Sequence, residues 1–249
     1  MNNDYIYGNS ERIFLNTTLG CKSKCSYCYL PSLNLVENFK IKITKLIILL
    51  KENTDFIKGK NGTILAIGCY SECWDIENRK DTINLINKLL YFQNPIQIAT
   101  KQEVTLFDFN NIKLSDIKYY NHLSIYISSV SITHHNTYEK GTSRPLLRFN
   151  SFKIKKKYNI PMYLYLKPII EKVTIRDIDF YLDLIKEYDI EVIVGKLFET
   201  SGKNLAPISN GILKYSDKIN RDYENIFNIL KNYTKVYETS IEPILKGVE

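Results

Sequence analysis

The sequence lacks any long apolar segment. Its longest apolar run, residues 46–50, falls far short of the roughly 18 residues that predict a membrane span. The amino terminus, residues 1–4, is polar and shows no signal-peptide pattern. Internal repeats and low-complexity linkers are also absent. We therefore expect a cytoplasmic protein with no membrane partner, in which cysteines stay reduced.

Cysteine is scarce and confined to the first third of the chain. Five cysteines occur among 249 residues, and none lies beyond residue 73. The hydrophobic content of 44% is ordinary for a globular protein, and 24% charged residues argue against a disordered chain. The net charge of +7 permits a polyanionic partner such as nucleic acid without showing one.

Three of the cysteines, Cys21, Cys25 and Cys28, form a C-x3-C-x2-C triplet. Cysteine thiolates are the usual ligands of iron–sulfur clusters. Three thiolates on one tight loop could hold three irons of a [4Fe–4S] cluster and leave the fourth iron open, and an open position makes a metal centre reactive. A rival interpretation is a zinc site completed by Cys69 or Cys73, but the spacing of the triplet favours the cluster.

Apolar stretches and amphipathic stretches alternate along the chain. After an irregular lead-in over 1–12, strands are expected at 12–17, 63–67, 96–99, 123–127, 162–166 and 191–194. Helices are expected at 36–50, 79–92, 104–107, 145–158, 174–188 and 221–232, with a loop over 200–218. Asn34 is the expected N-cap of the first helix, Pro145 the first residue of the fourth, and Thr174 with Asp177 a capping box for the fifth.

This alternation predicts parallel βαβ units and hence an α/β fold. Six units suggest a partial (β/α)6 TIM-type barrel. We expect a single domain over 1–249, with the barrel core at 12–198 and a C-terminal extension at 199–249 that carries one helix.

Polar or reactive residues follow every predicted strand. In chain order they are the cysteine triplet, residues 68–74, Lys101, Ser128, Lys167 and residues 195–198. Active sites of parallel α/β barrels are built from the carboxyl ends of strands and the loops beyond them. We therefore expect all six segments to lie on one face.

The triplet, with Tyr27 directly before its third cysteine, resembles the signature of radical S-adenosylmethionine (SAM) enzymes. The partial (β/α)6 barrel is also the usual fold of that superfamily. The resemblance implies that the open iron chelates the amino and carboxylate groups of SAM. It further implies that the reduced cluster, fed by a flavodoxin or ferredoxin, cleaves SAM to methionine and a 5′-deoxyadenosyl radical that abstracts hydrogen from a substrate. Because no cysteine lies beyond residue 73, one cluster is expected.

Within that superfamily the chain is similar to the spore photoproduct lyase branch. A Gly-Gly-Glu-Pro type segment usually follows the second strand, whereas residues 68–75 read Gly-Cys-Tyr-Ser-Glu-Cys-Trp-Asp. Cys-Tyr-Leu at 28–30, Ala-Thr-Lys at 99–101, Tyr-Ile-Ser at 126–128 and Arg144-Pro145 with Arg148 agree with the branch. The similarity covers most of residues 13–198, and the lyase's N-terminal region and DNA-contacting C-terminal part find no match in this sequence.

The resemblance assigns cofactor contacts to four residues. Tyr27 would pack beside the cluster and the adenine of SAM, and Glu72 would accept a hydrogen bond from the SAM amino group. Lys101 would pair with the SAM carboxylate, since a cation at a strand end is costly to bury unpaired. Ser128 would hydrogen-bond to the amino-acid part or the ribose of SAM.

Cys69 is a candidate hydrogen-atom donor. It follows Cys28 by 41 residues, a separation comparable to that of the cysteine in the lyase that returns hydrogen to the product radical. A thiol S–H bond is weak enough to quench a carbon radical. The structural reading, a small buried cysteine chosen for packing, remains open. Cys73 corresponds to no catalytic position of the branch.

Several charged residues have plain surface interpretations. His134 and His135 are expected as a solvent-exposed pair in a loop. Arg144 and Arg148 could hold a phosphate or carboxylate, but a solvated helix face is favoured. The basic run 153–157 is expected on the outer face of its helix, with a nucleic-acid contact as the rival interpretation.

Three hypotheses follow for function. The first is a radical SAM enzyme that repairs or modifies nucleic acid, the second is one that acts on a peptide or a small metabolite, and the third is a zinc-thiolate protein without catalysis. The small size of the chain also leaves room for a partner protein that supplies substrate binding.

Overall fold

The structure is a computed structural model that describes residues 4–35, 39–197 and 219–245. Its main sheet contains, in spatial order, β1 (Ile6–Gly8), β2 (Arg12–Leu15), β6 (Ile64–Ile67), β7 (Ile96–Thr100), β8 (Leu123–Ser128), β10 (Met162–Leu166), β11 (Glu191–Val194) and β12 (Val236–Tyr237). All neighbours are parallel except β1 and β2. The six predicted strands are β2, β6, β7, β8, β10 and β11, in chain order, so the predicted α/β partial barrel is confirmed.

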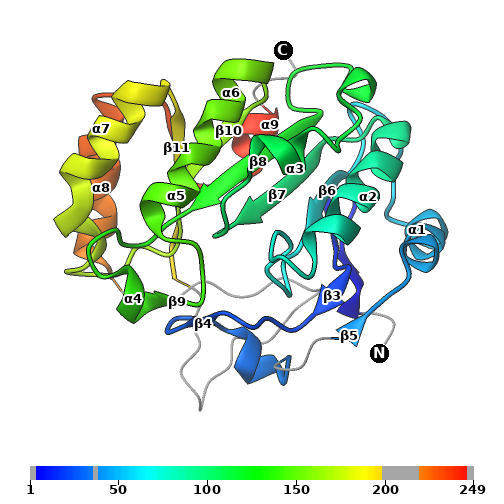
Figure 1. Ribbon diagram of the computed structural model, residues 1–249, viewed down its shortest axis with the longest axis horizontal. Helices are drawn as coiled ribbons and strands as arrows, with labels where there is room; N and C mark the ends of the chain where they lie inside the picture. Colours follow the sequence, from blue (N-terminus) through cyan, green and yellow to red (C-terminus); the bar gives the residue numbers. More distant parts are fainter. Residues whose placement is uncertain (1–3, 36–38, 198–218, 246–249) are drawn as a thin grey trace.

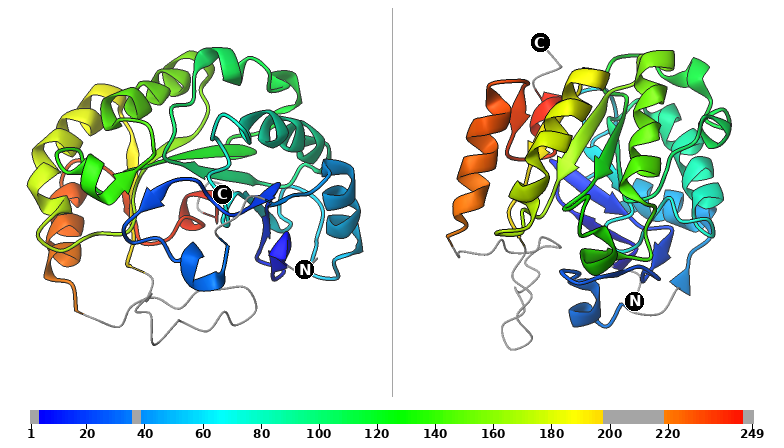
Figure 2. Two further views of the ribbon diagram at one scale, coloured as in Figure 1. Left: turned by 60° about the horizontal axis from the view of Figure 1, so that its bottom comes forward. Right: turned by 60° about the vertical axis from the view of Figure 1, so that its left-hand side comes forward.

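Helices cover the outer side of this curved sheet (Figures 1 and 2). They are α1 (Ile43–Glu52), α2 (Arg79–Leu89), α3 (Leu106–Phe109), α5 (Pro145–Phe149), α6 (Lys153–Tyr158), α7 (Ile178–Tyr188) and α8 (Arg221–Lys231). Two further short helices, α4 (His135–Tyr138) and α9 (Glu242–Leu245), lie at opposite ends of the sheet. No helix among the described residues is long and apolar enough to cross a membrane.

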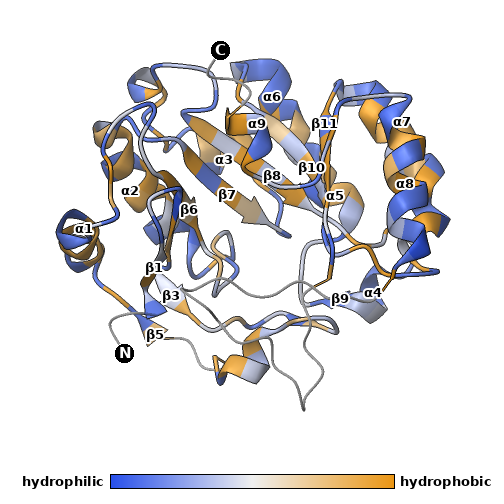
Figure 3. Ribbon diagram, turned by 180° about the vertical axis from the view of Figure 1, so that it is seen from behind, coloured by the Kyte–Doolittle hydropathy of each residue, from blue (hydrophilic) through white to orange (hydrophobic). Residues whose placement is uncertain are grey.

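Alternation along the strands decides which side chains face the helices. In β2, Ile13 and Leu15 are fully buried in the core beneath α1 and α2, whereas Arg12 and Phe14 point to the other side and line a cavity. The helices carry their apolar residues toward the sheet and their polar residues outward, as the two-coloured ribbons of Figure 3 show. The sheet therefore separates an apolar layer from a more polar interior.

Two small ribbons hold the cysteine loop at the carboxyl ends of the strands (Figure 1). One pairs β3 (Thr18–Leu19) with β5 (Phe39–Lys40), and the other pairs β4 (Lys24–Cys25) with β9 (Glu139–Lys140). The second ribbon joins the cysteine loop to the segment after β8, two regions more than 100 residues apart in sequence.

The first predicted helix is wrong at its amino end. Asn34 is not an N-cap: it closes a short 3-10 helix, Leu30–Leu33, in the left-handed conformation with φ 57°. The helix α1 begins only at Ile43, after Lys42 in an extended conformation. The apolar periodicity was read too far back, and residues 36–38 lie outside the described residues.

Two other local expectations fail because tertiary contacts compete with them. The lead-in expected to be irregular contains β1, which pairs with β2. The Thr174–Asp177 capping box does not form. Instead the Thr174 hydroxyl accepts from the Ile170 N–H, and the Asp177 carboxylate accepts from Ile132, Thr133 and Ser131 beyond β8.

The C-terminal extension holds more than the single helix expected. After α8, the described part adds β12 to the sheet edge beside β11 and then α9. A strand of two residues is too short to show a period in sequence, which explains why it was missed. The expected loop over 200–218 lies outside the described residues.

Candidate cluster and cofactor site

The three predicted cluster ligands lie on one loop beyond β2 and line one cavity. Cys21, Cys25 and Cys28 are partly exposed, and none forms a disulfide. Cys25 is fixed by the β4–β9 ribbon, and the Cys28 N–H donates to the Cys25 carbonyl at 3.1 Å. The loop therefore presents three free thiols to a common space.

Burial raises the pKa of all three thiols. For Cys25 the value reaches about 11, although nearby Lys101 pulls it down. Glu72 adds to the rise at Cys21. Thiols bind metals as thiolates, so loading this site releases protons.

The donor set fits a cluster better than a single zinc ion. Among residues 4–35, 39–197 and 219–245, no three His, Cys, Asp or Glu side chains lie close enough to hold one metal ion. A cubane cluster is larger than an ion, so its thiolate ligands stand further apart. Cys73, one of the two candidates to complete a zinc site, is fully buried and directs its Sγ to the Ala99 carbonyl at 3.8 Å.

Cys73 instead has a packing role. Gly68, at φ +83°, approaches it so closely that a Cβ at position 68 would lie 2.3 Å from the Cys73 Cβ. The Thr82 hydroxyl donates to the Cys73 carbonyl at 2.6 Å. The chain thus turns tightly after β6 and leaves Cys69, not Cys73, on the cavity side.

Arg148 is the largest departure from the sequence interpretation. A solvated helix face was favoured, but Arg148 is 0% exposed. Its Nη1 donates to Glu139 Oε2 at 2.7 Å and to the Ser128 carbonyl at 2.5 Å. The Tyr27 hydroxyl donates to Glu139 Oε1 at 2.6 Å. This fully buried ion pair ties the cysteine loop to the end of β8, whereas Arg144 is exposed as expected.

Tyr27 and Lys101 lie near this ion pair and near each other. The Lys101 Nζ lies 5.7 Å from the centre of the Tyr27 ring, and both residues line the cavity. Burial and the neighbouring Glu139 raise the pKa of Tyr27 well above its ordinary value. Burial works to lower the pKa of Lys101, but the neighbouring Cys25, Glu139 and Glu72 outweigh it and the net change is upward. Lys101 therefore stays a cation.

Glu72 joins the ends of β6 and β7. Its Oε1 accepts from the Thr100 hydroxyl at 2.5 Å and from the Trp74 N–H at 3.1 Å, and its Oε2 accepts from the Lys101 N–H at 2.9 Å. A carboxylate offers about four acceptor positions. One position therefore remains for a donor in the cavity, which Glu72 also lines.

Two buried serine hydroxyls in the cavity wall have no partner among the described residues. They belong to Ser128, which was predicted, and to Ser71, which was not. Buried hydroxyls are usually hydrogen-bonded, so two orphans in one cavity indicate a polar ligand. With Lys101 and Glu72 they offer a cation, an anion and two hydroxyls, which match the carboxylate, amino group and hydroxyls of SAM. The only sequence signal for Ser71 was its position in segment 68–75.

Cys69 contacts a tyrosine that the sequence reasoning did not single out. The Tyr29 hydroxyl lies 3.2 Å from the Cys69 Sγ and donates to the Cys69 carbonyl at 2.8 Å. Burial, followed by the neighbouring Cys69, raises the pKa of Tyr29 well above its ordinary value. Tyr29 directly follows Cys28, and this position in the motif was the available signal.

The remaining strand ends also reach the cavity. Lys167 lines it beyond β10, and a Cβ at Gly195 would lie 2.5 Å from the Lys167 Cδ, so glycine makes room for the lysine stem. Lys196 and Leu197 line the cavity too, while residue 198 lies outside the described residues. The prediction that all six strand ends face one site is confirmed.

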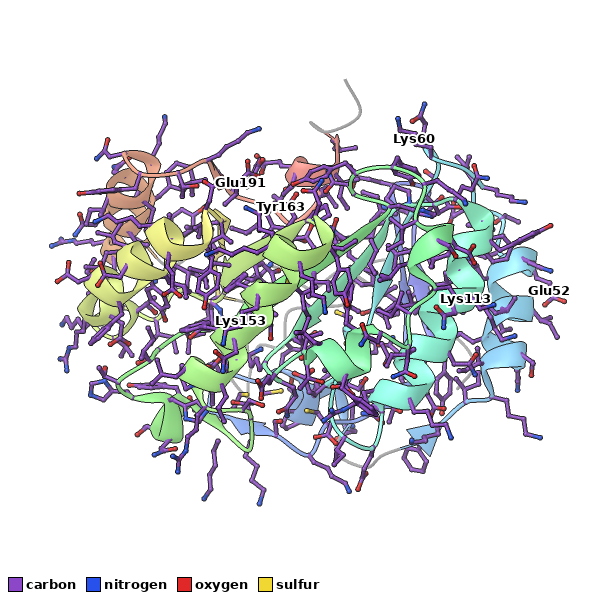
Figure 4. All side chains as sticks on the ribbon, turned by 45° about the horizontal axis from the view of Figure 1, so that its top comes forward. Glu52, Lys60, Lys113, Lys153, Tyr163 and Glu191 are labelled. Carbon is purple, nitrogen blue, oxygen red and sulfur yellow. The ribbon has the colours of Figure 1, made fainter. Side chains whose placement is uncertain are left out.

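The other charged candidates lie away from the cavity. His134 is exposed as expected, but His135 is buried, and its Nε2 lies 3.1 Å from the Thr142 hydroxyl. The basic run 153–157 belongs to α6, where Lys153 projects outward in Figure 4. The expectation of an outer helix face is therefore confirmed for this run.

Below the cofactor residues, inward-facing side chains of the strands enclose a space that we call the lumen. It is lined by Arg12, Phe14, Gln97, Tyr126, Tyr165 and Ser240. The Ser240 carbonyl accepts from Gln97 Nε2 at 2.5 Å and from the Tyr126 hydroxyl at 2.8 Å. The segment before α9 thus closes the amino end of the barrel, near the labelled Tyr163 and Glu191 of Figure 4.

No protein-family model and no curated protein matches the sequence. Solved structures do match. Spore photoproduct lyase complexed with a dinucleoside spore photoproduct has a TM-score of 0.64 at 14% identity, covering 88% of this chain and 74% of the lyase. A mutant of the lyase with bound AdoMet and the dinucleoside gives 0.63 at 15% identity, with 91% and 76% covered.

A different protein, Streptococcus suis SuiB, matches at a TM-score of 0.62 and 14% identity. The match covers 90% of this chain but only 48% of SuiB, which has also been seen with bound S-adenosylmethionine. At such identities the likeness concerns the fold. The chain has the spore photoproduct lyase-like fold of the radical SAM enzymes that its sequence predicted.

Proposed function

We propose that the protein is a radical SAM enzyme that binds one [4Fe–4S] cluster through Cys21, Cys25 and Cys28 and removes hydrogen from a carbon of its substrate. The observation that carries the proposal is the opening of three free thiols onto the cavity with the two orphan hydroxyls. When bound, the cluster and SAM supply the one-electron chemistry and the 5′-deoxyadenosyl radical. The protein supplies position and exclusion of water.

Lys101, Glu72, Ser71 and Ser128 orient SAM in this proposal. Lys101 takes the SAM carboxylate, and the free acceptor position of Glu72 takes the amino group. The hydroxyls of Ser71 and Ser128 find their partners on SAM. Tyr27, held by Glu139, packs against the cluster and the adenine. A flavodoxin or ferredoxin is the proposed electron donor.

Cys69 returns a hydrogen atom to the product radical. The S–H bond breaks evenly, the hydrogen goes to carbon, and the unpaired electron stays on sulfur. Tyr29 lies 3.2 Å from that sulfur, close enough to pass on its hydroxyl hydrogen and leave the unpaired electron on its ring. The Tyr29 radical would then regain its hydrogen in one of two ways. It could take a hydrogen atom from the 5′-methyl group of 5′-deoxyadenosine, or one electron from the reduced external donor together with one proton from water.

Substitution of Cys69 tests this step. In Cys69→Ala the abstraction proceeds but the product radical lacks its hydrogen source, so we expect more SAM consumed per product and trapped or branched products. Cys73→Ala is the matched control, because Cys73 is a thiol four residues away that lies outside the cavity. Unchanged product yield in Cys69→Ala would remove Cys69 from the mechanism.

Two substrate classes have support. Nucleic acid is supported by the net charge of +7 and by the dinucleoside in the lyase structures that share this fold. A small metabolite is supported by the closed amino end of the lumen, where Ser240 accepts from Gln97 and Tyr126. A binding series with oligonucleotides at rising salt separates them, since a phosphate-backbone contact weakens steeply with salt. A partner protein that supplies substrate binding stays a prediction.

A further inference from the structure

The lumen contains a cation that the proposed SAM chemistry does not use. Arg12 begins β2 and faces inward with Phe14, while Ile13 and Leu15 between and after them are buried in the outer core. We propose that Arg12 binds an anionic group, phosphate or carboxylate, at the end of a small substrate that lies along the lumen. This inference rests on the proposed function and names the substrate class.

Arg12 is held in place without being neutralised. Its guanidinium lies 4.7 Å from the centre of the Phe14 ring, and its Nη1 donates to the Ser240 hydroxyl at 3.0 Å. Within the described ranges it forms no ion pair, although an arginine carries five N–H donors. The donors that remain are available to an anionic ligand in the cavity that Arg12 lines.

The charge of the whole cavity points the same way. Its described lining contains Arg12, Lys101, Lys167 and Lys196 but only one carboxylate, that of Glu72. Glu72 already accepts from Thr100, Trp74 and Lys101. The carboxylate of SAM pairs with Lys101, whereas Arg12 has no carboxylate beside it among the described residues and keeps its positive charge after SAM has bound. Low-dielectric walls concentrate such a field on an anionic ligand.

The amino end of the lumen around Arg12, which we call the floor, is closed by protein groups and leaves no passage for a polymer. Gln97 and Tyr126 both donate to the Ser240 carbonyl, and Asn121 donates to the Pro243 carbonyl at 2.9 Å. The adjoining Tyr126, Tyr163 and Tyr237 are buried. A chain that continued in both directions would meet this floor, so the ligand must end here.

Strand length sets the span of the substrate. Gln97 and Lys101 lie four residues apart on β7 and its continuation, and a rise of about 3.3 Å per residue separates them by about 13 Å. The anion at the floor therefore lies on the order of 10 Å from the hydrogen that is abstracted near Cys69. Phe14, Tyr126 and Tyr165 line the space between, which suits a flat or apolar middle part.

Anion-dependent thermal stability tests the proposal without requiring the substrate. The cluster-loaded protein is heated in sodium phosphate, sodium succinate or sodium chloride at equal ionic strength. Phosphate or succinate is expected to raise the Tm by about 3 °C over chloride through binding to the folded state. Arg12→Gln should lose this rise, and Arg144→Gln, which removes an exposed arginine outside the cavity, should keep it.

The two anions identify the source of the anionic group, because the one that Arg12 recognises gives the larger shift. A second experiment compares the equilibrium binding of nucleoside 5′-monophosphates, nucleosides and a single-stranded oligonucleotide without a terminal phosphate. If phosphate is the group, the monophosphate should bind at least about tenfold more tightly than the nucleoside in the natural protein, and this ratio should approach one in Arg12→Gln. Oligonucleotide binding should not change in Arg12→Gln.

Equal anion effects in the natural protein and Arg12→Gln would overturn the proposal, as would no anion effect in either. Oligonucleotide binding that depends on Arg12 would replace the small anion with a nucleic acid polymer. Failure of the proposed function is a separate result: the natural protein would release no 5′-deoxyadenosine with SAM and dithionite, whatever the anions do to its Tm.

Discussion

The two ends of the cavity are built from different kinds of residue. The carboxyl end holds the cysteine loop, Lys101 and two orphan hydroxyls, all of which suit a cofactor. The amino end holds Arg12 and is closed by Ser240. This division is expected if the carboxyl end binds a cofactor that many enzymes share and the amino end binds the substrate of this enzyme. The cofactor chemistry stays the same between such enzymes, while the recognised substrate changes.

The two ends also differ in how far apart their residues lie in the sequence. The cysteine end is carried by residues close together in the chain, such as Cys21, Cys25 and Cys28. The amino end joins Arg12 to Ser240, residues 228 positions apart. A local motif therefore identifies the first end, and only the folded chain identifies the second.

Loss of one cluster ligand at the carboxyl end should have the largest effect on activity. Cys25→Ala removes a thiolate from the triplet, so we expect iron and sulfide to fall to background and 5′-deoxyadenosine release to stop, with the circular dichroism spectrum unchanged. Cys73→Ala should keep its iron and still release 5′-deoxyadenosine, because the Cys73 thiol lies outside the cavity. An active Cys25→Ala protein would break the assignment of the cysteine end.

Breaking the buried ion pair should destabilise the cysteine end strongly. Arg148→Met leaves the Glu139 carboxylate buried and unpaired, which should lower the free energy of unfolding by about 3–5 kcal/mol in urea titrations. Arg79→Met is the control, since the Arg79–Asp108 pair at 2.7 Å is partly exposed and should matter less. Equal losses of unfolding free energy in the two variants would mean that the Arg148 ion pair stabilises the protein no more than a partly exposed one.

Removal of one orphan hydroxyl should weaken SAM alone. Ser128→Ala deletes a hydroxyl without a protein partner in the described chain, so stability should hold while SAM affinity falls about 5–10-fold, the value of about one hydrogen bond. Ser129→Ala is a suitable neighbour control, because its hydroxyl is paired with Tyr181 at 3.2 Å. Unchanged SAM affinity in Ser128→Ala would place SAM elsewhere.

The smallest effect concerns pH at the amino end. His122, just before β8, is buried, and its Nδ1 accepts from the Lys118 N–H, which requires the neutral ring. Burial lowers its pKa to about 4, with Lys118 adding to the effect. The unfolded chain, with a His pKa of about 6.5, then binds the extra proton. Stability should therefore fall as pH drops from about 6.5 to 4, by about 1 kcal/mol between pH 7 and 5.

Urea midpoints measured across that range check the prediction. His122→Asn keeps an acceptor for the Lys118 N–H but does not titrate, so its stability should depend less on pH. An equal pH dependence in both proteins would assign the effect to other groups.

Sequence reasoning recovered the architecture because strand and helix periods are local. The bounds of β10 and β11 were predicted without error, and the six strand ends meet as expected. It failed at Arg148, whose i, i+4 spacing with Arg144 looked like a solvated face, because the burial of that side chain depends on Glu139 from another segment. It also passed over Ser71, Tyr29 and Arg12, whose roles follow from what surrounds them.

The measurement that tests the central claim most directly is anaerobic reconstitution followed by reduction with dithionite in the presence of SAM. The account predicts a brown protein with about four irons and four sulfides per chain that releases 5′-deoxyadenosine. A colourless protein with stoichiometric zinc, or a full cluster that leaves SAM intact, would contradict it.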